Sequence, residues 1–110
     1  MNDRTTPVEI QTASARLRVR QHVELFPTGK WSITPAAISL LAHHRVDPAG
    51  IIWRHRAGDW GDVDLDQAMA NNDAVLFGGP ILSMYRMGCN LVSIETVDAG
   101  AITRISTTRD

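Results

Sequence analysis

The chain has 110 residues, of which 44% are hydrophobic and 21% charged, and its formal net charge is −1. This composition is typical of a single globular domain with a buried core, and the near balance of charge argues against a strongly basic nucleic-acid binder and against a whole-surface mimic of DNA. The only cysteine, Cys89, excludes an intrachain disulfide, and no apolar run approaches the ~20 residues of a membrane span, so we expect a cytoplasmic protein with no membrane association.

Residues 1–15 are polar and show no periodicity, which predicts a flexible N-terminal arm before a single domain over residues 16–110. Arginines alternate with apolar residues from position 16 to position 20, as they would along a strand. Arg16, Arg18 and Arg20 would then share one face, where they could bind phosphate or protect a sheet edge from aggregation. After a proline-glycine turn, residues 30–33 are predicted to form a second short strand.

Two helices are predicted next, each from a capping side chain followed by proline. Thr34 and the proline after it start a helix over about residues 35–44, and Asp47 with its following proline starts a second one. Gly58 is suited to end that second helix. The side chains expected on the inner faces of the two helices are Ile38, Leu41, Ala42, Ile51, Ile52 and His55.

A third helix is predicted from Asp64 to Phe77, because Asp64 with Gln67 three positions later resembles a capping box. Its apolar side chains recur at helical spacing, and Asn72 interrupts this stripe, so we expect Asn72 to be a buried amide that needs a partner. A glycine pair ends the helix. The side chains of the stripe are Leu65, Ala68, Met69 and Leu76.

The last third of the chain is predicted to be β structure. Residues 81–87 and 91–97 are rich in strand formers, and the glycine-containing turn between them indicates a hairpin; residues 101–107 read as a third strand. The expected order is β-α-α-α-β-β-β. The fold class is therefore α+β, with a small antiparallel sheet of three to five strands packed against about three helices.

The run Gly58-Asp59-Trp60-Gly61 predicts a shaped turn after the second helix, and shaped loops often carry function. His55 precedes it on an apolar face. Oriented by Asp59, a neutral imidazole there could act as a general base, or it could be a buried histidine that only stabilises the turn. Gly58, Gly61, His55 and Asn72 are expected to form this structural motif, with Trp60 as a core plug.

Aspartates at positions 62, 64, 66 and 73 partly imitate a calcium-binding loop. Such a loop needs glycine at its sixth position, where this chain has Gln67, and acidic residues are favoured at a helix N-terminus in any case. We therefore interpret these aspartates as helix-capping and first-turn residues. No metal and no cofactor are expected.

A set of motifs over roughly residues 25–107 resembles a family of small uncharacterised bacterial proteins found on plasmids and integrative elements, some of them labelled type I restriction endonuclease subunit M. The chain lacks the length and the glycine-rich nucleotide loop of a methyltransferase, so that label cannot describe its activity. The resemblance implies an accessory protein of a mobile element. The motifs are Thr34-Pro35-Ala36, His55, Gly58-Asp59-Trp60-Gly61, Asn72-Asp73, Gly78-Gly79 and Ile81-Leu82-Ser83-Met84-Tyr85.

We expect from these observations a non-enzymatic interaction protein of a bacterial mobile element, with inhibition of host defence (of the anti-CRISPR or antirestriction type) as its form of action. One alternative is a nucleic-acid-binding accessory protein that uses the strand of Arg16, Arg18 and Arg20 together with Arg54. Another is a small enzyme with His55 and Asp59 as an acid–base pair. The residues expected to contact a protein partner, such as a host defence complex, are Arg54, Arg56, Asp59, Trp60 and Asp62.

Overall fold

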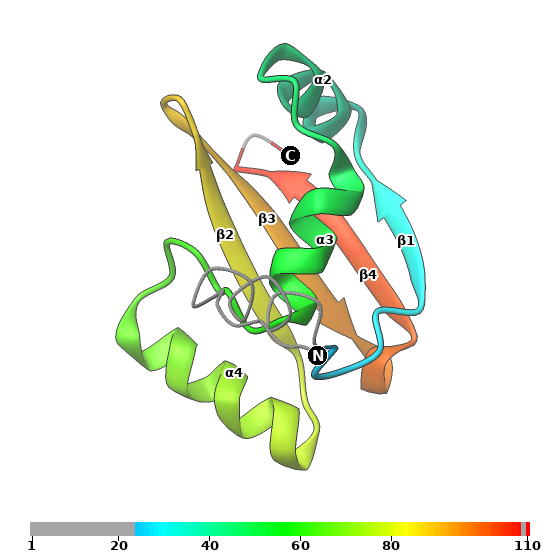
Figure 1. The fold of residues 1–110 in the computed structure, drawn as a ribbon, viewed down its shortest axis with the longest axis vertical. Helices are drawn as coiled ribbons and strands as arrows, with labels where there is room; N and C mark the ends of the chain where they lie inside the picture. Colours follow the sequence, from blue (N-terminus) through cyan, green and yellow to red (C-terminus); the bar gives the residue numbers. More distant parts are fainter. Residues whose placement is uncertain (1–23, 109) are drawn as a thin grey trace, which may run out of the picture.

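The computed structural model describes residues 24–108 and residue 110. The order of elements agrees with the predicted β-α-α-α-β-β-β (Figure 1). The predicted arm and the arginine strand at residues 16–20 lie outside the described residues. The elements are β1 (Lys30–Ile33), α2 (Pro35–His43), α3 (Pro48–Arg56), α4 (Leu65–Phe77), β2 (Ile81–Met87), β3 (Asn90–Val97), the short 3₁₀ helix η1 (Asp98–Gly100) and β4 (Ile102–Thr107).

The four strands form one sheet in the order β1-β4-β3-β2. Strands β2, β3 and β4 are antiparallel neighbours, as predicted, but β1 pairs with β4 in parallel, so the sheet is mixed and the prediction of a purely antiparallel sheet was wrong in this pair. A parallel pair requires a long crossover connection. Here three helices and a hairpin separate β1 from β4, which supplies that connection.

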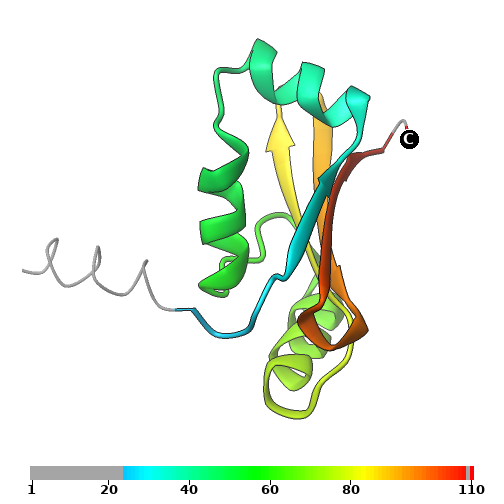
Figure 2. The ribbon, with the colours of Figure 1, turned by 90° about the vertical axis from the view of Figure 1, so that its right-hand side faces the viewer.

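Helix α3 lies across one face of the sheet, with α2 at one end of the molecule and α4 at the other (Figures 1 and 2). Along β2 every second side chain, from Ile81 to Met87, is buried, as expected for a strand with one covered face. The core has two parts. The larger joins α2 and α3 to the sheet, and the smaller contains Phe26, Trp60, Ala74 and Ile81.

The three predicted helix starts are confirmed by their capping bonds. The hydroxyl of Thr34 accepts from a backbone N–H of α2 at 3.2 Å, Asp47 caps α3 at 2.9 Å, and Asp64 caps α4 at 2.8 Å. The inner face predicted for α3 is correct. That of α2 was partly wrong: Leu41 is buried but Ile38 is exposed, because one short helix packed at the end of a sheet buries only a narrow stripe.

Helix α4 is rotated about its axis relative to the predicted orientation. Asn72 is exposed, whereas the adjacent Asn71 is fully buried together with Ala74. The Asn71 amide donates to the carbonyl of Leu82 at 2.7 Å and accepts from the N–H of Leu82 at 3.0 Å. These two bonds satisfy backbone groups at the free edge of β2 and fix the side of the helix that carries Asn71 and Ala74 against the sheet. Of the predicted stripe, Leu65, Met69 and Leu76 therefore face outward, whereas Ala68 packs against the smaller part of the core.

Candidate functional site

The turn at residues 58–61 runs along the edge strand β2. Met84 donates its N–H to the carbonyl of Trp60 at 3.0 Å, and its carbonyl accepts the N–H of Asp62 at 2.6 Å. Gly61 lies between them at a φ of +71°, and a Cβ there would stand 2.0 Å from the Met84 oxygen. Only glycine allows this close approach. The turn therefore covers a sheet edge, which explains its second glycine.

Trp60 is a core residue, since only 9% of its surface is exposed. Its ring centroid lies 6.1 Å from that of Phe26, and its indole N–H donates to the side-chain oxygen of Asn72 at 3.1 Å. Trp60 was predicted both as a core plug and as a partner contact. In the structure Trp60 lies in the core, and little of its surface is left to contact a partner.

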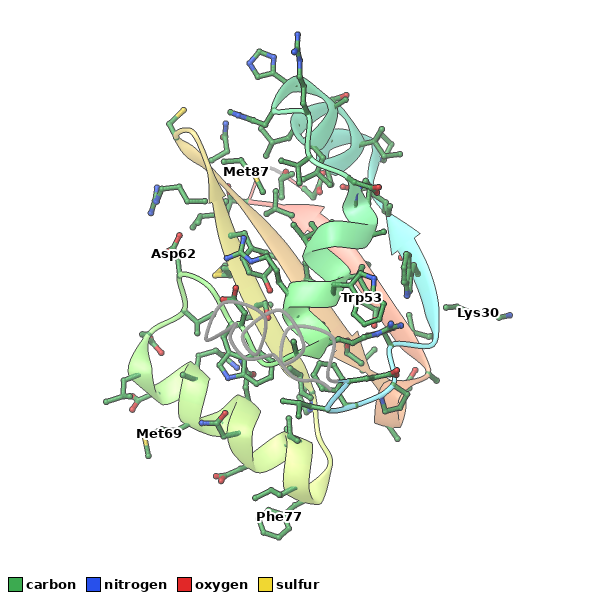
Figure 3. All side chains as sticks on the ribbon, viewed as in Figure 1. Lys30, Trp53, Asp62, Met69, Phe77 and Met87 are labelled. Atoms are coloured by element: carbon green, nitrogen blue, oxygen red, sulfur yellow. The ribbon has the colours of Figure 1, made fainter. Side chains whose placement is uncertain are left out.

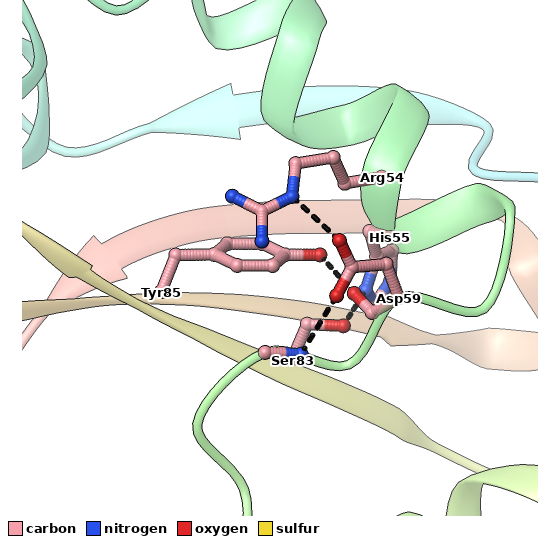
Figure 4. Close-up of polar contacts among 6 residues, drawn as sticks. Arg54, His55, Asp59, Ser83 and Tyr85 are labelled. Carbon is pink, nitrogen blue, oxygen red and sulfur yellow. Dashed lines mark hydrogen bonds and ion pairs between the residues drawn. The ribbon is translucent and has the colours of Figure 1, made fainter. Parts of the chain in front are cut away.

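Arg54 and Asp59 form an ion pair at 2.7 Å on the surface, both about half exposed. The Arg54 guanidinium lies 4.2 Å above the centre of the Tyr85 ring, and the Tyr85 hydroxyl donates to the backbone carbonyl of Asp59 (Figure 4). Burial raises the pKa of Tyr85 to about 12, so this phenol stays protonated and keeps donating at physiological pH. The group therefore fixes the turn onto α3 and β2.

The remaining predicted contact residues point elsewhere. Arg56 donates to the hydroxyl of Thr28 at 3.0 Å and lies 4.8 Å from the centre of the Trp53 ring. A carboxylate oxygen of Asp62, just after the turn, lies 3.8 Å from the guanidinium Nε of Arg86. Arg54 and Arg56 are two positions apart on one helix, which separates their directions. The five predicted contact residues thus do not share one surface.

His55 is completely buried between α3 and the sheet. Its Nδ1 lies 2.6 Å from the hydroxyl of Ser83 and its Nε2 lies 2.9 Å from that of Thr96, which in turn lies 2.7 Å from the hydroxyl of Thr103. Burial lowers the pKa of His55 to about 4. A neutral ring donates from one nitrogen and accepts at the other, so both nitrogens are satisfied within this chain of hydroxyls.

This arrangement does not bring His55 and Asp59 together as an acid–base pair. The imidazole bonds to two hydroxyls in the core, while the Asp59 carboxylate pairs with Arg54 at the surface. A general base must reach a proton of its substrate, and a buried ring with both nitrogens bonded cannot do so. Asn72 accepts from the indole N–H of Trp60, whose ring centroid lies 6.2 Å from that of His55, and so takes part in the packing of the turn. His55 is therefore a structural residue in this geometry.

The sequence reasoning missed the partners of His55 because serine and threonine in strands carry no distinctive motif. A signal was nevertheless present. Side chains alternate between the two faces of a strand. Ser83 takes an inward-facing position in the predicted strand 81–87, and Thr96 takes one in the strand 91–97. Polar side chains at inward positions of a strand must find partners, and the only titratable side chain predicted on the inner face of a covering helix was His55.

The outer side of α4 carries the most exposed large apolar side chains of the described chain. Leu65 and Leu76 are each 74% exposed, Met69 is 55% and Phe77 is 84% exposed. Figure 3 shows Met69 and Phe77 directed away from the body of the molecule. We call these four residues the α4 outer face. Leu65, Met69 and Leu76 are four and seven positions apart, so they form one stripe along the helix.

Comparison with protein families, with curated proteins and with solved structures finds no match to this chain. Over the part of the chain that the structure describes, no three histidine, cysteine, aspartate or glutamate side chains gather as a metal site. None of the helices at residues 24–108 combines the length and the apolar character that a membrane crossing requires.

Proposed function

We propose that this chain is a non-enzymatic interaction protein that binds a protein partner through the α4 outer face. The observation that carries this proposal is the orientation of α4: the helix places an asparagine in the core and its leucines outside. Contiguous exposed apolar side chains on a soluble domain commonly mark an interaction site. Burying a leucine fully is worth about 1.5–3 kcal/mol, so four such side chains could stabilise a complex.

The proposal includes the biological setting implied by the family resemblance. A protein of a plasmid or integrative element that acts by binding would act on a host protein, and a defence complex is the partner we propose, with inhibition as the outcome. This part rests on the resemblance alone. The physical part, binding through α4, stands without it.

The two alternatives receive less support. The arginine strand of the nucleic-acid hypothesis lies outside the described residues, and the further candidate Arg54 is already paired with Asp59. The enzyme hypothesis needs His55 to face a substrate, and His55 is buried with both ring nitrogens bonded. We therefore place binding through α4 first.

A site-specific crosslinking experiment tests the proposal. A photo-reactive amino acid is introduced at Leu76 in one variant and at Ile38, an exposed apolar side chain of α2, in a matched control. After illumination in a host cell, we expect one discrete adduct from position 76, none from position 38, and loss of the adduct when Leu65→Ser is added. Equal adducts from both positions, or none from position 76, would contradict binding through α4.

A further inference from the structure

Charge along the chain is strongly segregated around the α4 outer face. Between residues 57 and 85 there is no lysine, arginine or histidine. The same segment contains five aspartates, which are Asp59, Asp62, Asp64, Asp66 and Asp73. This segment therefore carries a formal charge of −5, although the whole chain is nearly neutral.

Three of the five aspartates have partners inside the molecule. Asp59 pairs with Arg54, Asp62 lies near Arg86, and Asp64 caps α4. Asp66 and Asp73, both exposed, have no hydrogen bond or ion pair with any residue of the described part of the chain. These two carboxylates are therefore the ones available to a partner.

Asp66 and Asp73 also occupy corresponding positions beside the apolar stripe. The stripe Leu65, Met69, Asn72 and Leu76 has spacings of four, three and four, which is the heptad pattern of a helix that packs against another helix. Asp66 and Asp73 each follow a stripe residue by one position and are seven apart, so both lie along the same edge of the stripe. In heptad packing, charges at this edge select the partner helix.

We propose that the α4 outer face binds an amphipathic helix of a partner protein that carries lysine or arginine along the edge facing Asp66 and Asp73. This inference rests on the proposed function and adds the chemistry of the partner. Helix α4 has 13 residues and is therefore about 20 Å long, enough to pack against between three and four turns of a partner helix. The apolar stripe supplies affinity, and the acidic edge supplies orientation and selectivity.

Charge also decides against two other occupants of this face. A symmetric pair of α4 helices would bring two identical acidic edges together, and α4 itself has no basic residue to neutralise them, which disfavours such a pair. An anionic membrane surface would repel the same aspartates. A basic amphipathic helix is the partner that fits both the apolar stripe and the acidic edge of the α4 outer face.

The test uses two synthetic peptides of about 18 residues with the same leucine stripe. One has lysine and the other glutamate at the flanking positions. Binding to the full-length protein is measured by fluorescence anisotropy at low and at high salt. We expect the lysine peptide to bind at least about tenfold more tightly than the glutamate peptide, and the difference to shrink at high salt.

Matched variants locate the binding and its charge dependence. Leu65→Ser with Leu76→Ser should weaken binding of the lysine peptide at least about tenfold, because two exposed leucines no longer reach the partner. Ile38→Ser on α2 is the control and should leave affinity unchanged. Asp66→Lys with Asp73→Lys should reverse the preference in favour of the glutamate peptide. These are surface positions, and circular dichroism checks that each variant is folded.

Several results would overturn the inference. These are no binding of the lysine peptide, equal binding of both peptides, binding unaffected by the leucine substitutions, and a dimer in sedimentation that the leucine substitutions abolish. The crosslinking experiment distinguishes this failure from failure of the proposed function. A discrete adduct at position 76 without lysine-peptide preference would leave binding through α4 standing and reject only the basic helix.

Discussion

His55 predicts a specific acid sensitivity of the fold. Its pKa is about 4 in the folded protein and 6.5 in an unfolded chain, so the unfolded state takes up the proton first as the pH falls. Stability therefore decreases between pH 6.5 and pH 4 and levels off below that range. The same two pKa values give a loss of about 1 kcal/mol from pH 7 to pH 5.5, and of about 2 kcal/mol from pH 7 to pH 4.5.

The measurement is the free energy of unfolding in urea at pH 7.0, 5.5 and 4.5. The free energy of unfolding of a typical domain is about 5–15 kcal/mol, so a loss of this size is easily measured. The series stops at pH 4.5 because carboxylates contribute below it: the hydroxyl of Thr34 lowers the pKa of Asp110, which adds a second acid-sensitive group. His55→Gln is the matched variant, since its amide can still donate and accept but does not titrate.

We expect His55→Gln to be less stable at pH 7 and to have a much smaller pH dependence between 7 and 4.5. If the variant fails to fold, the imidazole nitrogens of His55 in the wild-type protein are followed directly by NMR. A His55 ring that becomes protonated near pH 6.5, or a variant with the same pH slope as the wild type, would refute the buried, neutral histidine.

Two pairs of alanine substitutions, compared by their effect on the free energy of unfolding, test how the edge strand β2 is covered. Gly61→Ala should cost more than about 3 kcal/mol because its Cβ would stand 2.0 Å from a backbone oxygen at a positive φ, whereas Gly50→Ala, with nothing within 4 Å, should add about 0.5 kcal/mol of helix stability. Asn71→Ala should cost about 2–4 kcal/mol because it leaves two backbone groups of β2 without partners, and Asn72→Ala only about 1 kcal/mol for its single bond. All four are read from urea unfolding at pH 7. Equal costs at positions 71 and 72, or a mild effect at position 61, would contradict these assignments.

Local signals in the sequence were sufficient for the elements of the fold. The caps Thr34, Asp47 and Asp64 each act on their own helix, and their chemistry can be recognised within four residues. The inward face of α3 followed from periodicity, because that helix packs along one face of the sheet and buries Ile51, Ile52 and His55 against it (Figure 2). The fold class could therefore be predicted without any knowledge of tertiary contacts.

The arrangement of the candidate site depended on contacts distant in sequence. His55 bonds to residues 28 and 41 positions away, and no local pattern specifies such partners. Periodicity identified an apolar stripe on α4 but not its direction, because hydrophobicity alone favours burying the stripe. The parallel pairing of β1 with β4 likewise joins residues 72 positions apart, such as Lys30 and Ile102, which no local pattern specifies.

The direction of α4 follows from the requirement to satisfy β2. In this edge strand, Leu82 and Met84 direct their N–H and carbonyl groups away from β3. Trp60 and Asp62, in and just after the turn, satisfy the two backbone groups of Met84, and the Asn71 amide satisfies both groups of Leu82. Rotating α4 to bury its leucines would remove Asn71 from Leu82 and leave a buried donor and acceptor without partners. The exposure of the apolar stripe is therefore required by the fold itself, and a partner helix can bury the stripe without disturbing the sheet.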